Sequence, residues 1–499
     1  MSVVGPRLRP NLFERSRPGR GNGKIPHPPA DALDRLPTEA RREQPPALPE
    51  LNEPEVVRHY VNLSQLNYAV DTGFYPLGSC TMKFYPKLNE WAARLPGFAQ
   101  LHPLAPDEAA QGTLELLWEL EQSLAEIAGM RAVTLQPAAG AQGELAGILM
   151  IRAYHRDRGD TERTEVLVPD SSHGTNPATA TMAGLRTVTI PSAPDGGVDL
   201  EAFEAALGPR TAAVMITNPS TLGLFEKRIG ELLTAVHEAG ALAYMDGANL
   251  NAILGRFKPG EAGFDVMHIN VHKTFSTPHG GGGPGSGPVG VGERLVPYLP
   301  EPRVLREADG SFRLERPGER ATSIGRLRSY VGNTGVLVRA YAYIRAHGAS
   351  GLREVSDDAV LAANYLKHRL RGAYDIPYDR PCKHEFVASA STIRKRTGVR
   401  TLDIAKRLID HGFHPPTIYF PLIVDEGMLI EPTETEPVET LDAFADALLE
   451  IAREAESDPA ALHDAPRSAP VRRLDEATAA RQPNLRWKPM TGRQMPCPD

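Results

Sequence analysis

Between about residue 130 and residue 271, short apolar runs alternate with longer segments whose apolar residues recur at helical spacing. The spacing predicts helices over 142–158 and 230–239. Continuous apolar strands separated by helices indicate a mostly parallel sheet covered on both faces, and therefore an α/β fold. The runs expected to form strands are 132–136, 165–170, 187–190, 212–218, 241–246 and 265–271.

The flanking segments show different patterns. Residues 1–50 are rich in Pro, Gly and charged residues and predict a peripheral arm, whereas 54–69, 115–129 and 335–348 have helical spacing. We therefore expect four parts in this chain. They are an N-terminal arm with a helix and a loop (1–90), a large domain (91–345), a smaller α+β domain (346–455) and an extended tail (456–499).

Composition narrows the function classes. The chain has 499 residues with 41% hydrophobic and 23% charged residues, which is typical of a globular protein. A net charge of −7 gives no reason to expect nucleic-acid binding. Cys80, Cys382 and Cys497 match no metal-binding spacing, so we expect no metal site and a reducing cytoplasm. No apolar run approaches membrane-spanning length, so we expect no membrane association.

Polar clusters follow the predicted strands at positions where an α/β sheet binds ligands. One cluster contains His272 and Lys273, followed by a glycine-rich stretch that includes 280–283. A partly desolvated lysine beyond a buried strand suits a Schiff-base nucleophile, and glycines let the backbone pass close to a planar ligand. Alternatively, Lys273 is a surface lysine before a flexible loop. A phosphate loop is set aside because the Gly-Lys-Ser/Thr ending is absent.

A second cluster begins at Asp246, which ends the run 241–246. A carboxylate in this position can pair with the pyridinium nitrogen of pyridoxal phosphate (PLP) and keep that nitrogen protonated. Alternatively, Asp246 caps the following turn. One strand separates it from Lys273, which is similar to large PLP enzymes of the aspartate aminotransferase fold.

Three further clusters are compatible with a PLP site. Gly140, Ala141 and Gln142 begin a predicted helix, whose free amides can bind a phosphate. His173 follows a strand and can stack on a pyridine ring, and Asn218 can donate to a phenolate oxygen. Each of these features also has an ordinary structural explanation. All five clusters at strand ends of one sheet are harder to attribute to chance.

Several long stretches resemble the P protein of the glycine cleavage system, the family of decarboxylating glycine dehydrogenases, and specifically its lysine-bearing half. The resemblance covers about residues 54–490, with further matches at 332–344, 384–389, 414–436 and 470–487. The most specific stretches are LSQLNYAVDTGFYPLGSCTMKFYPK (63–87), DSSHGTNPATA (170–180), MDGANLNAILG (245–255) and NVHKTFSTPHGGGGPGSGP (270–288).

The resemblance implies a fold type I PLP enzyme that decarboxylates glycine and transfers the aminomethyl group to the oxidised lipoyl arm of the H protein. It implies catalytic roles for Lys273 and His272. The implied cofactor-binding residues are Lys273, Asp246, His173, Gly140, Ala141, Gln142, Asn218 and Ala248. The implied substrate-side residues, for which structural packing is an equal alternative, are Ser79, Cys80, Thr81 and Lys83.

The resemblance also implies partners. Only the lysine-bearing half is present, so a homologous subunit 1 is expected, with two copies of each subunit. Arg58, Arg339 and the 431–434 turn are possible substrate contacts, but salt bridges or a solvated surface explain them equally well.

Two rival functions are open at this point. A group II amino-acid decarboxylase also places His before its lysine, but the stretches at 63–87 and 414–436 count against it. A non-catalytic scaffold subunit is a different class, against which Lys273 and Asp246 count.

Overall fold

The computed structural model describes residues 9–21, 29–44, 46–279 and 285–486. The chain divides into two compact units. The first consists of Met1–Tyr68 with Asp464–Asp499, and the second of Ala69–His463. Among the described helices, none is both long and apolar enough to cross a membrane.

The first unit joins the two ends of the chain and contains short helices. Asn52 caps its longest helix, because its side chain accepts from the backbone N–H of Glu55 while Glu55 accepts from the backbone N–H of Asn52. This helix ends at Ser64, earlier than the spacing over 54–69 predicts. The elements are α1 (Leu12–Arg15), η1 (Thr38–Ala40), α2 (Glu53–Ser64) and α17 (Glu476–Arg481).

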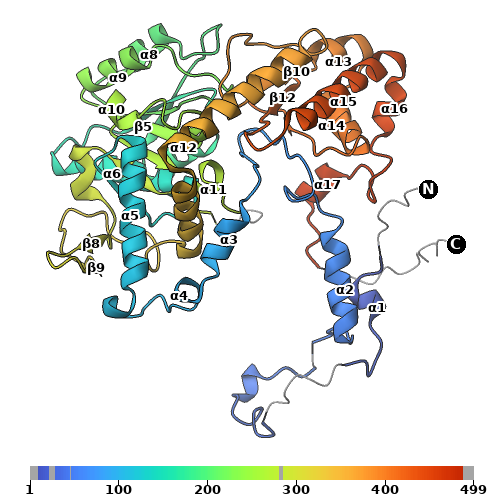
Figure 1. The fold of residues 1–499 in the computed structure, drawn as a ribbon, viewed down its shortest axis with the longest axis horizontal. Coiled ribbons are helices and arrows are strands. Elements are labelled where there is room, and N and C mark those ends of the chain that lie inside the picture. Colours follow the sequence, from blue (N-terminus) through green and yellow to red (C-terminus); the bar gives the residue numbers. More distant parts are fainter. Residues whose placement is uncertain (1–8, 22–28, 45, 280–284, 487–499) are drawn as a thin grey trace. The chain divides into compact units, whose positions relative to one another are not determined.

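The second unit contains a seven-stranded sheet in the order β1-β7-β6-β5-β4-β2-β3. Its strand β5 is labelled in Figure 1. The predicted mostly parallel sheet is confirmed, but β7 is antiparallel to both β1 and β6 and was not predicted. Its three residues, Val-Gly-Val, follow a glycine-rich stretch and are too short to give a strand signal. The strands are β1 (Ala132–Thr134), β2 (Glu165–Pro169), β3 (Arg186–Ile190), β4 (Thr211–Thr217), β5 (Leu242–Gly247), β6 (Val266–Ile269) and β7 (Val289–Val291).

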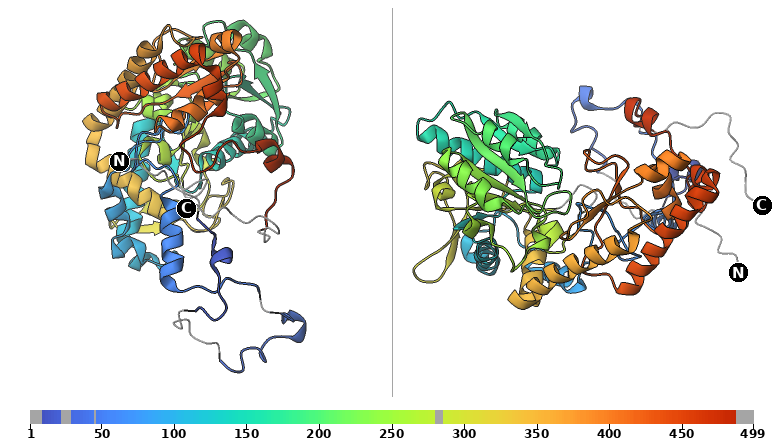
Figure 2. Two further views of the ribbon diagram at one scale, coloured as in Figure 1. Left: turned by 90° about the vertical axis from the view of Figure 1, so that its right-hand side faces the viewer. Right: turned by 90° about the horizontal axis from the view of Figure 1, so that it is seen from above.

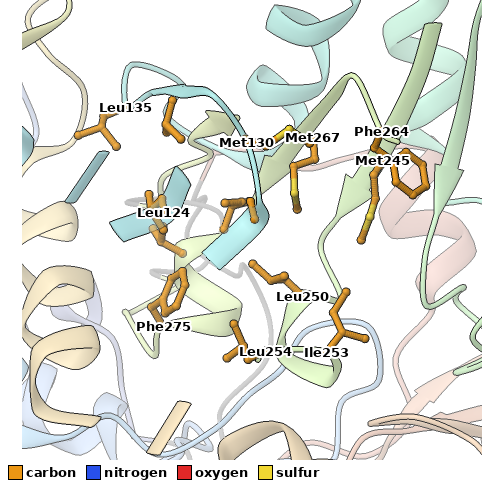
Figure 3. Packing of buried hydrophobic residues seen from close by; sticks show 14 of the residues in the cluster. Leu124, Met130, Leu135, Met245, Leu250, Ile253, Leu254, Phe264, Met267 and Phe275 are labelled. Atoms are coloured by element: carbon orange, nitrogen blue, oxygen red, sulfur yellow. The ribbon is translucent and has the colours of Figure 1, made fainter. Parts of the chain in front are cut away.

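The sheet is buried on both faces because alternate side chains of each strand enter different hydrophobic clusters. In β5, Ala243 and Met245 join one cluster, whereas Leu242 and Tyr244 join the other. Helices cover both faces (Figure 2), and Figure 3 shows Met245 and Met267 on the first face with Leu124 and Phe275. The covering helices are α5 (Gln111–Ala128), α6 (Gly140–Asp157), α7 (Thr175–Met182), α8 (Leu200–Ala206) and α9 (Ile229–Glu238).

Shorter elements connect these layers. Gly129 ends α5 in a left-handed conformation with φ of 66°, the usual glycine C-terminal signal. A small antiparallel hairpin, formed by β8 and β9, contacts α5. The connecting elements are α3 (Lys87–Ala93), α4 (Pro96–Ala99), η2 (Asp107–Ala109), η3 (Leu250–Ala252), α10 (Pro259–Ala262), α11 (Val271–Thr274), η4 (Glu293–Tyr298), β8 (Val304–Arg306) and β9 (Phe312–Leu314).

The C-terminal part has its own antiparallel sheet, in the order β10-β12-β11, and its own hydrophobic cluster around Phe386, Met428 and Phe444. The long helix that leads to it changes direction at Gly348, whose φ of 61° is not helical. The predicted α+β architecture of the C-terminal part is thus confirmed. Its elements are α12 (Thr334–Leu370), β10 (Phe386–Ser389), α13 (Ser391–Thr397), α14 (Thr401–Asp410), β11 (Thr417–Ile418), β12 (Gly427–Ile430), α15 (Val438–Ser457) and α16 (Pro459–Asp464).

The packing of α5 yields a stability prediction. Leu120 is 0% exposed within the large cluster, so Leu120→Ala should lower the free energy of unfolding by about 2–5 kcal/mol. Urea unfolding followed by circular dichroism measures this loss. The matched variant Leu104→Ala, at a residue 71% exposed, should change it by less than about 0.5 kcal/mol. Equal losses in the two variants would contradict this packing.

Candidate active site

A cavity of about 230 Å³ lies at the carboxyl ends of the parallel strands. The loops after β1, β2, β4, β5 and β6 all contribute residues to it. The polar clusters predicted at the ends of these strands therefore meet at one edge of the sheet. Its lining residues are Ser79, Ala139, Gly140, Ala141, Glu144, His173, Thr175, Thr217, Thr221, Asp246, Ala248, Asn249, His268, Asn270, His272 and Lys273.

Lys273 lies on α11, the single helical turn that directly follows β6. The backbone of this turn is closed by the Lys273 N–H, which donates to the Asn270 carbonyl at 3.0 Å. The turn therefore carries Lys273 into the cavity lining, together with His272. The glycines at 280–283, expected to pass close to a ligand, lie outside the described residues.

Asp246 is the penultimate residue of β5 and is only 2% exposed. Its Oδ2 accepts from Asn176 Nδ2 at 3.0 Å and from Thr217 Oγ1 at 3.4 Å, and its Oδ1 accepts from the backbone N–H of Ala248 at 2.9 Å. The Nε2 of His268 lies 3.2 Å from Oδ1. Burial works to raise the pKa of Asp246, but His268 and these hydrogen bonds together hold it below its usual value. The site therefore keeps a buried, ionised carboxylate.

Two other members of this network were not assigned roles from the sequence. Glu144 on α6 accepts from Thr175 Oγ1 at 2.8 Å and from Asn176 Nδ2 at 3.1 Å, and burial with the nearby Asp246 raises its pKa to about 7. His268 is the polar residue inside the apolar strand β6, and its Nδ1 lies 2.7 Å from the Tyr244 hydroxyl. In the sequence, the feature that indicates this buried network is a histidine inside an otherwise apolar strand.

The two predicted site histidines differ in surroundings. His173 is solvent-exposed, and its Nδ1 lies 2.8 Å from Thr175 Oγ1. His272 is mostly enclosed, and burial together with His279 and Lys273 lowers its pKa to about 3. The imidazole of His272 is therefore neutral at physiological pH.

The amino end of α6 faces the cavity through Gly140 and Ala141. No side chain caps this helix, so its first amides are available to an anion. A Cβ at Gly140 would lie 2.2 Å from Asn270 Oδ1, so this position requires glycine. Gln142 does not line the cavity; its Oε1 accepts from the Ala138 N–H at 2.7 Å and fixes the turn.

Asn218 follows β4, is completely buried and lies outside the cavity lining. Its Oδ1 accepts from the Glu226 N–H at 3.1 Å. Its Nδ2 has no hydrogen-bond partner among the groups described. The predicted hydrogen bond to the phenolate oxygen of PLP would give this buried donor an acceptor.

The predicted substrate-side loop is only partly at the cavity. Ser79 lines it, whereas Thr81 and Lys83 are buried elsewhere and Cys80 is partly buried, with burial raising the pKa of the Cys80 thiol. Lys83 Nζ forms an ion pair with Glu434 at 2.7 Å and donates to the Thr274 carbonyl at 2.8 Å. Lys83 thus supports the turn that carries Lys273.

The other expectations are less specific. Arg339 forms a two-pronged ion pair with Glu90 at 2.8 and 2.9 Å, which favours the salt-bridge explanation. Arg58 belongs to the first unit. Cys80 and Cys382 are free thiols, and Cys497 lies outside the described residues.

The fold and this site define a fold type I PLP-dependent enzyme. The described side chains fit the cofactor, because an ionised carboxylate, uncapped helix amides and a lysine surround one cavity. Two family comparisons agree with the fold. The aminotransferase class-V family matches residues 144–282, and the glycine dehydrogenase C-terminal domain matches residues 355–469.

Full-length relatives identify the family. The chain is 56% identical over 485 residues to the probable glycine dehydrogenase (decarboxylating) subunit 2 of Halalkalibacterium halodurans, covering 96% of this chain and 98% of that protein. It is 56% identical over 481 residues to the protein of the same name from Caldanaerobacter subterraneus, covering 95% and 98%. The chain belongs to the glycine dehydrogenase (decarboxylating) subunit 2 family.

Solved structures agree. A glycine decarboxylase, the P-protein of the glycine cleavage system in inhibitor-bound form, matches with a TM-score of 0.70 and 26% identity over 84% of this chain and 94% of that chain. Glutamate decarboxylase of Lactobacillus brevis matches with a TM-score of 0.62 and 14% identity over 85% and 97%, which shows the fold alone. A group II amino-acid decarboxylase therefore shares the fold, but the family comparisons do not support that function for this chain.

The placement of Lys273 yields a direct prediction. Purified protein incubated with PLP should show the visible absorbance of lysine-bound cofactor, and Lys273→Ala should abolish it, because no other lysine lines the described cavity. Absorbance spectra measure the binding, and far-ultraviolet circular dichroism checks the fold. The control Lys395→Ala removes an exposed lysine and should leave the absorbance unchanged. Retention of the absorbance by the Lys273 variant would refute the assignment.

Proposed function

We propose that this protein catalyses the PLP-dependent decarboxylation of glycine, releases CO2 and transfers the aminomethyl group to the oxidised lipoyl arm of the H protein. Membership of the glycine dehydrogenase family supports the reaction. The buried, ionised Asp246 in the same cavity as Lys273 is the observation that carries it. The lipoyl acceptor follows from the family resemblance.

PLP, when bound, supplies an electron sink for the bond that breaks at the α-carbon of the amino acid. Residues around the cavity would hold the ring nitrogen, the phosphate and the aldehyde carbon of PLP. Asp246 would hold a proton on the ring nitrogen, and the first amides of α6 would hold the phosphate. Lys273 would hold the aldehyde carbon and later accept or return a proton through its freed amine.

A chain of hydrogen bonds explains why Asp246 keeps its charge. Burial lowers the pKa of His268, so its imidazole is neutral and has one N–H. The Tyr244 hydroxyl can donate to Nδ1, which leaves the proton on Nε2 directed at Asp246. With Asn176 and Ala248 donating as well, the carboxylate cannot rotate away from the cavity.

Enclosed neutral histidines adjoin Lys273. Burial lowers the pKa of His272 to about 3 and that of His279 to about 4, and the nearby Lys273 acts in the same direction. Neither ring adds a positive charge beside the lysine amine. We propose that His272 contacts the substrate side and orients the reacting groups, consistent with its place in the cavity lining.

The assembly is also part of the proposal. The relatives are named subunit 2, which implies a subunit 1. We propose a cytoplasmic complex with two copies of each subunit, which acts on glycine and binds the lipoylated H protein.

Exchange of labelled bicarbonate into glycine tests the reaction. The protein combined with subunit 1, PLP and lipoylated H protein should incorporate label, and omission of the H protein should reduce incorporation strongly. Release of CO2 from glutamate or an aromatic amino acid, with no glycine exchange, would instead establish the group II decarboxylase alternative. No activity and no PLP binding would favour the scaffold alternative.

Asp246→Asn should lower the glycine exchange rate by roughly 100-fold or more, because the ring nitrogen loses the charge that keeps it protonated. The cofactor should still bind, since Lys273 and the α6 amides are retained. Exchange rates and cofactor absorbance are compared in the same samples. The control Asp357→Asn removes a carboxylate of similar type from the exposed ion pair with Arg256 and should retain full activity. Full activity in the Asp246 variant would rule out this role.

A further inference from the structure

Three buried titratable side chains have no role in the proposed reaction. His384 and Glu385 immediately precede β10, and Glu431 immediately follows β12; all three are 0% exposed. The antiparallel register pairs Phe386 with Ile430. Glu385 and Glu431 are therefore the next residues on two adjacent strands, which explains why two carboxylates meet in the interior.

Each carboxylate uses one oxygen to hold the loop at the cavity. Glu385 Oε2 accepts from the backbone N–H of Ser79 at 2.6 Å, and Glu431 Oε2 accepts from the backbone N–H of Thr81 at 2.9 Å. The second oxygen, Oε1, of each has no hydrogen-bond partner among the described groups. His384 Nε2 lies 3.8 Å from both of these Oε1 atoms and is also without a partner there.

The loop held in this way has an unusual backbone. Ser79 has φ of 63° and Thr81 has φ of 46°, the left-handed region that residues with a Cβ rarely adopt. A Cβ on Gly78 would lie 2.3 Å from Leu429 Cγ, so the loop is pressed against β12. Conformations of this kind persist only where surrounding groups hold them, and the two carboxylates do so here.

Glu385 and Glu431 cannot both be ionised in this buried position. Two ionised carboxylates directly opposite each other on adjacent strands repel, and without water to screen them both cannot stay charged. The titratable groups that face them are His384, Cys80, Lys273 and Glu434.

None of these groups fully compensates two negative charges. Burial lowers the pKa of His384 to about 3, so its imidazole is neutral. Burial raises the pKa of Glu431 to about 7, although hydrogen bonds from Thr81 and, to a smaller extent, the charge of Lys273 act to lower it. Burial together with Glu431 raises the pKa of Glu385 well above its usual value, although the Ser79 N–H and Lys273 act in the opposite direction. Glu434 is already paired with Lys83.

We propose that Glu385 and Glu431 share a single proton between their Oε1 atoms, and that this acid–carboxylate pair positions the Ser79–Thr81 turn at the rim of the cofactor cavity. One proton satisfies both orphaned oxygens and leaves one negative charge. One side-chain N or O atom from each of His384, Glu385 and Glu431 lies within 4.8 Å of the other two, so the three groups form one buried cluster. The two glutamates are positioning residues, and their effect on catalysis rests on the proposed function of this cavity.

Substitution by glutamine tests the pair, because an amide resembles a neutral carboxylic acid. Glu385→Gln and Glu431→Gln should each lower kcat/KM for glycine exchange by at most roughly threefold near neutral pH. The double variant has no anion to hold the turn, and its loss should exceed the product of the single losses by roughly tenfold. The exposed Glu439→Gln is the matched control and should behave as wild type.

The pH profile separates this role from simple packing. As pH rises, the wild type loses the shared proton, the two charges repel and the turn is released, so kcat/KM should fall on the alkaline side. Glu385→Gln has no such proton to lose, and its alkaline fall should move up by at least roughly one pH unit or disappear. An unchanged profile in that variant would show that the pair carries no functional proton.

Infrared spectroscopy tests the pair independently of activity. The wild type minus Glu385→Gln difference spectrum at neutral pH should contain the band of a protonated, buried carboxylic acid, which the Glu439→Gln difference spectrum should lack. Absence of this band would overturn the proposal, as would a stoichiometric divalent cation found by elemental analysis of the purified wild type. If glycine exchange failed in the wild type while the band was present, the proposed function would fall and the shared proton would stand.

Discussion

The site depends on one buried charge, the carboxylate of Asp246. A charge removed from water is tolerated only where hydrogen bonds and opposite charges replace the lost solvation. The replacing groups come from different parts of the chain. Thr217 lies on β4, His268 on β6, Asn176 on α7 and Ala248 on the turn after β5. The strand order β6-β5-β4 is what places these groups around one carboxylate.

A second buried charge links this region to the C-terminal part of the chain. Lys83 is completely buried and reaches Glu434, Asn251 and the carbonyl of Thr274. Removal of either member of such an ion pair leaves an uncompensated charge, which is costly in the interior. Lys83 therefore couples the 79–83 loop, the helical turn of Lys273 and the segment after β12. The pair formed by Glu385 and Glu431 acts on the same loop from the neighbouring strands.

The fold of this chain does not by itself determine its function. Glutamate decarboxylase of Lactobacillus brevis shares the architecture at 14% identity, so the sheet and its cavity do not select the substrate. The glycine dehydrogenase assignment comes instead from near-complete coverage at 56% identity. The buried carboxylate of Asp246, in the same cavity as Lys273, gives a physical reason for a PLP cofactor at this site.

The sequence by itself determined the main sheet, most of its strands and the class of chemistry. Apolar runs such as 241–246 are a local signal, and Asp246, Lys273 and the α6 glycine turn stand at strand ends where local pattern and sheet geometry coincide. What only the tertiary structure decided was the pairing of groups far apart in the chain. His268 looked like one polar residue in a strand, and Glu385 and Glu431 carried no joint signal at all. Their roles depend on strand register and on the exclusion of water, and neither property exists until the chain has folded.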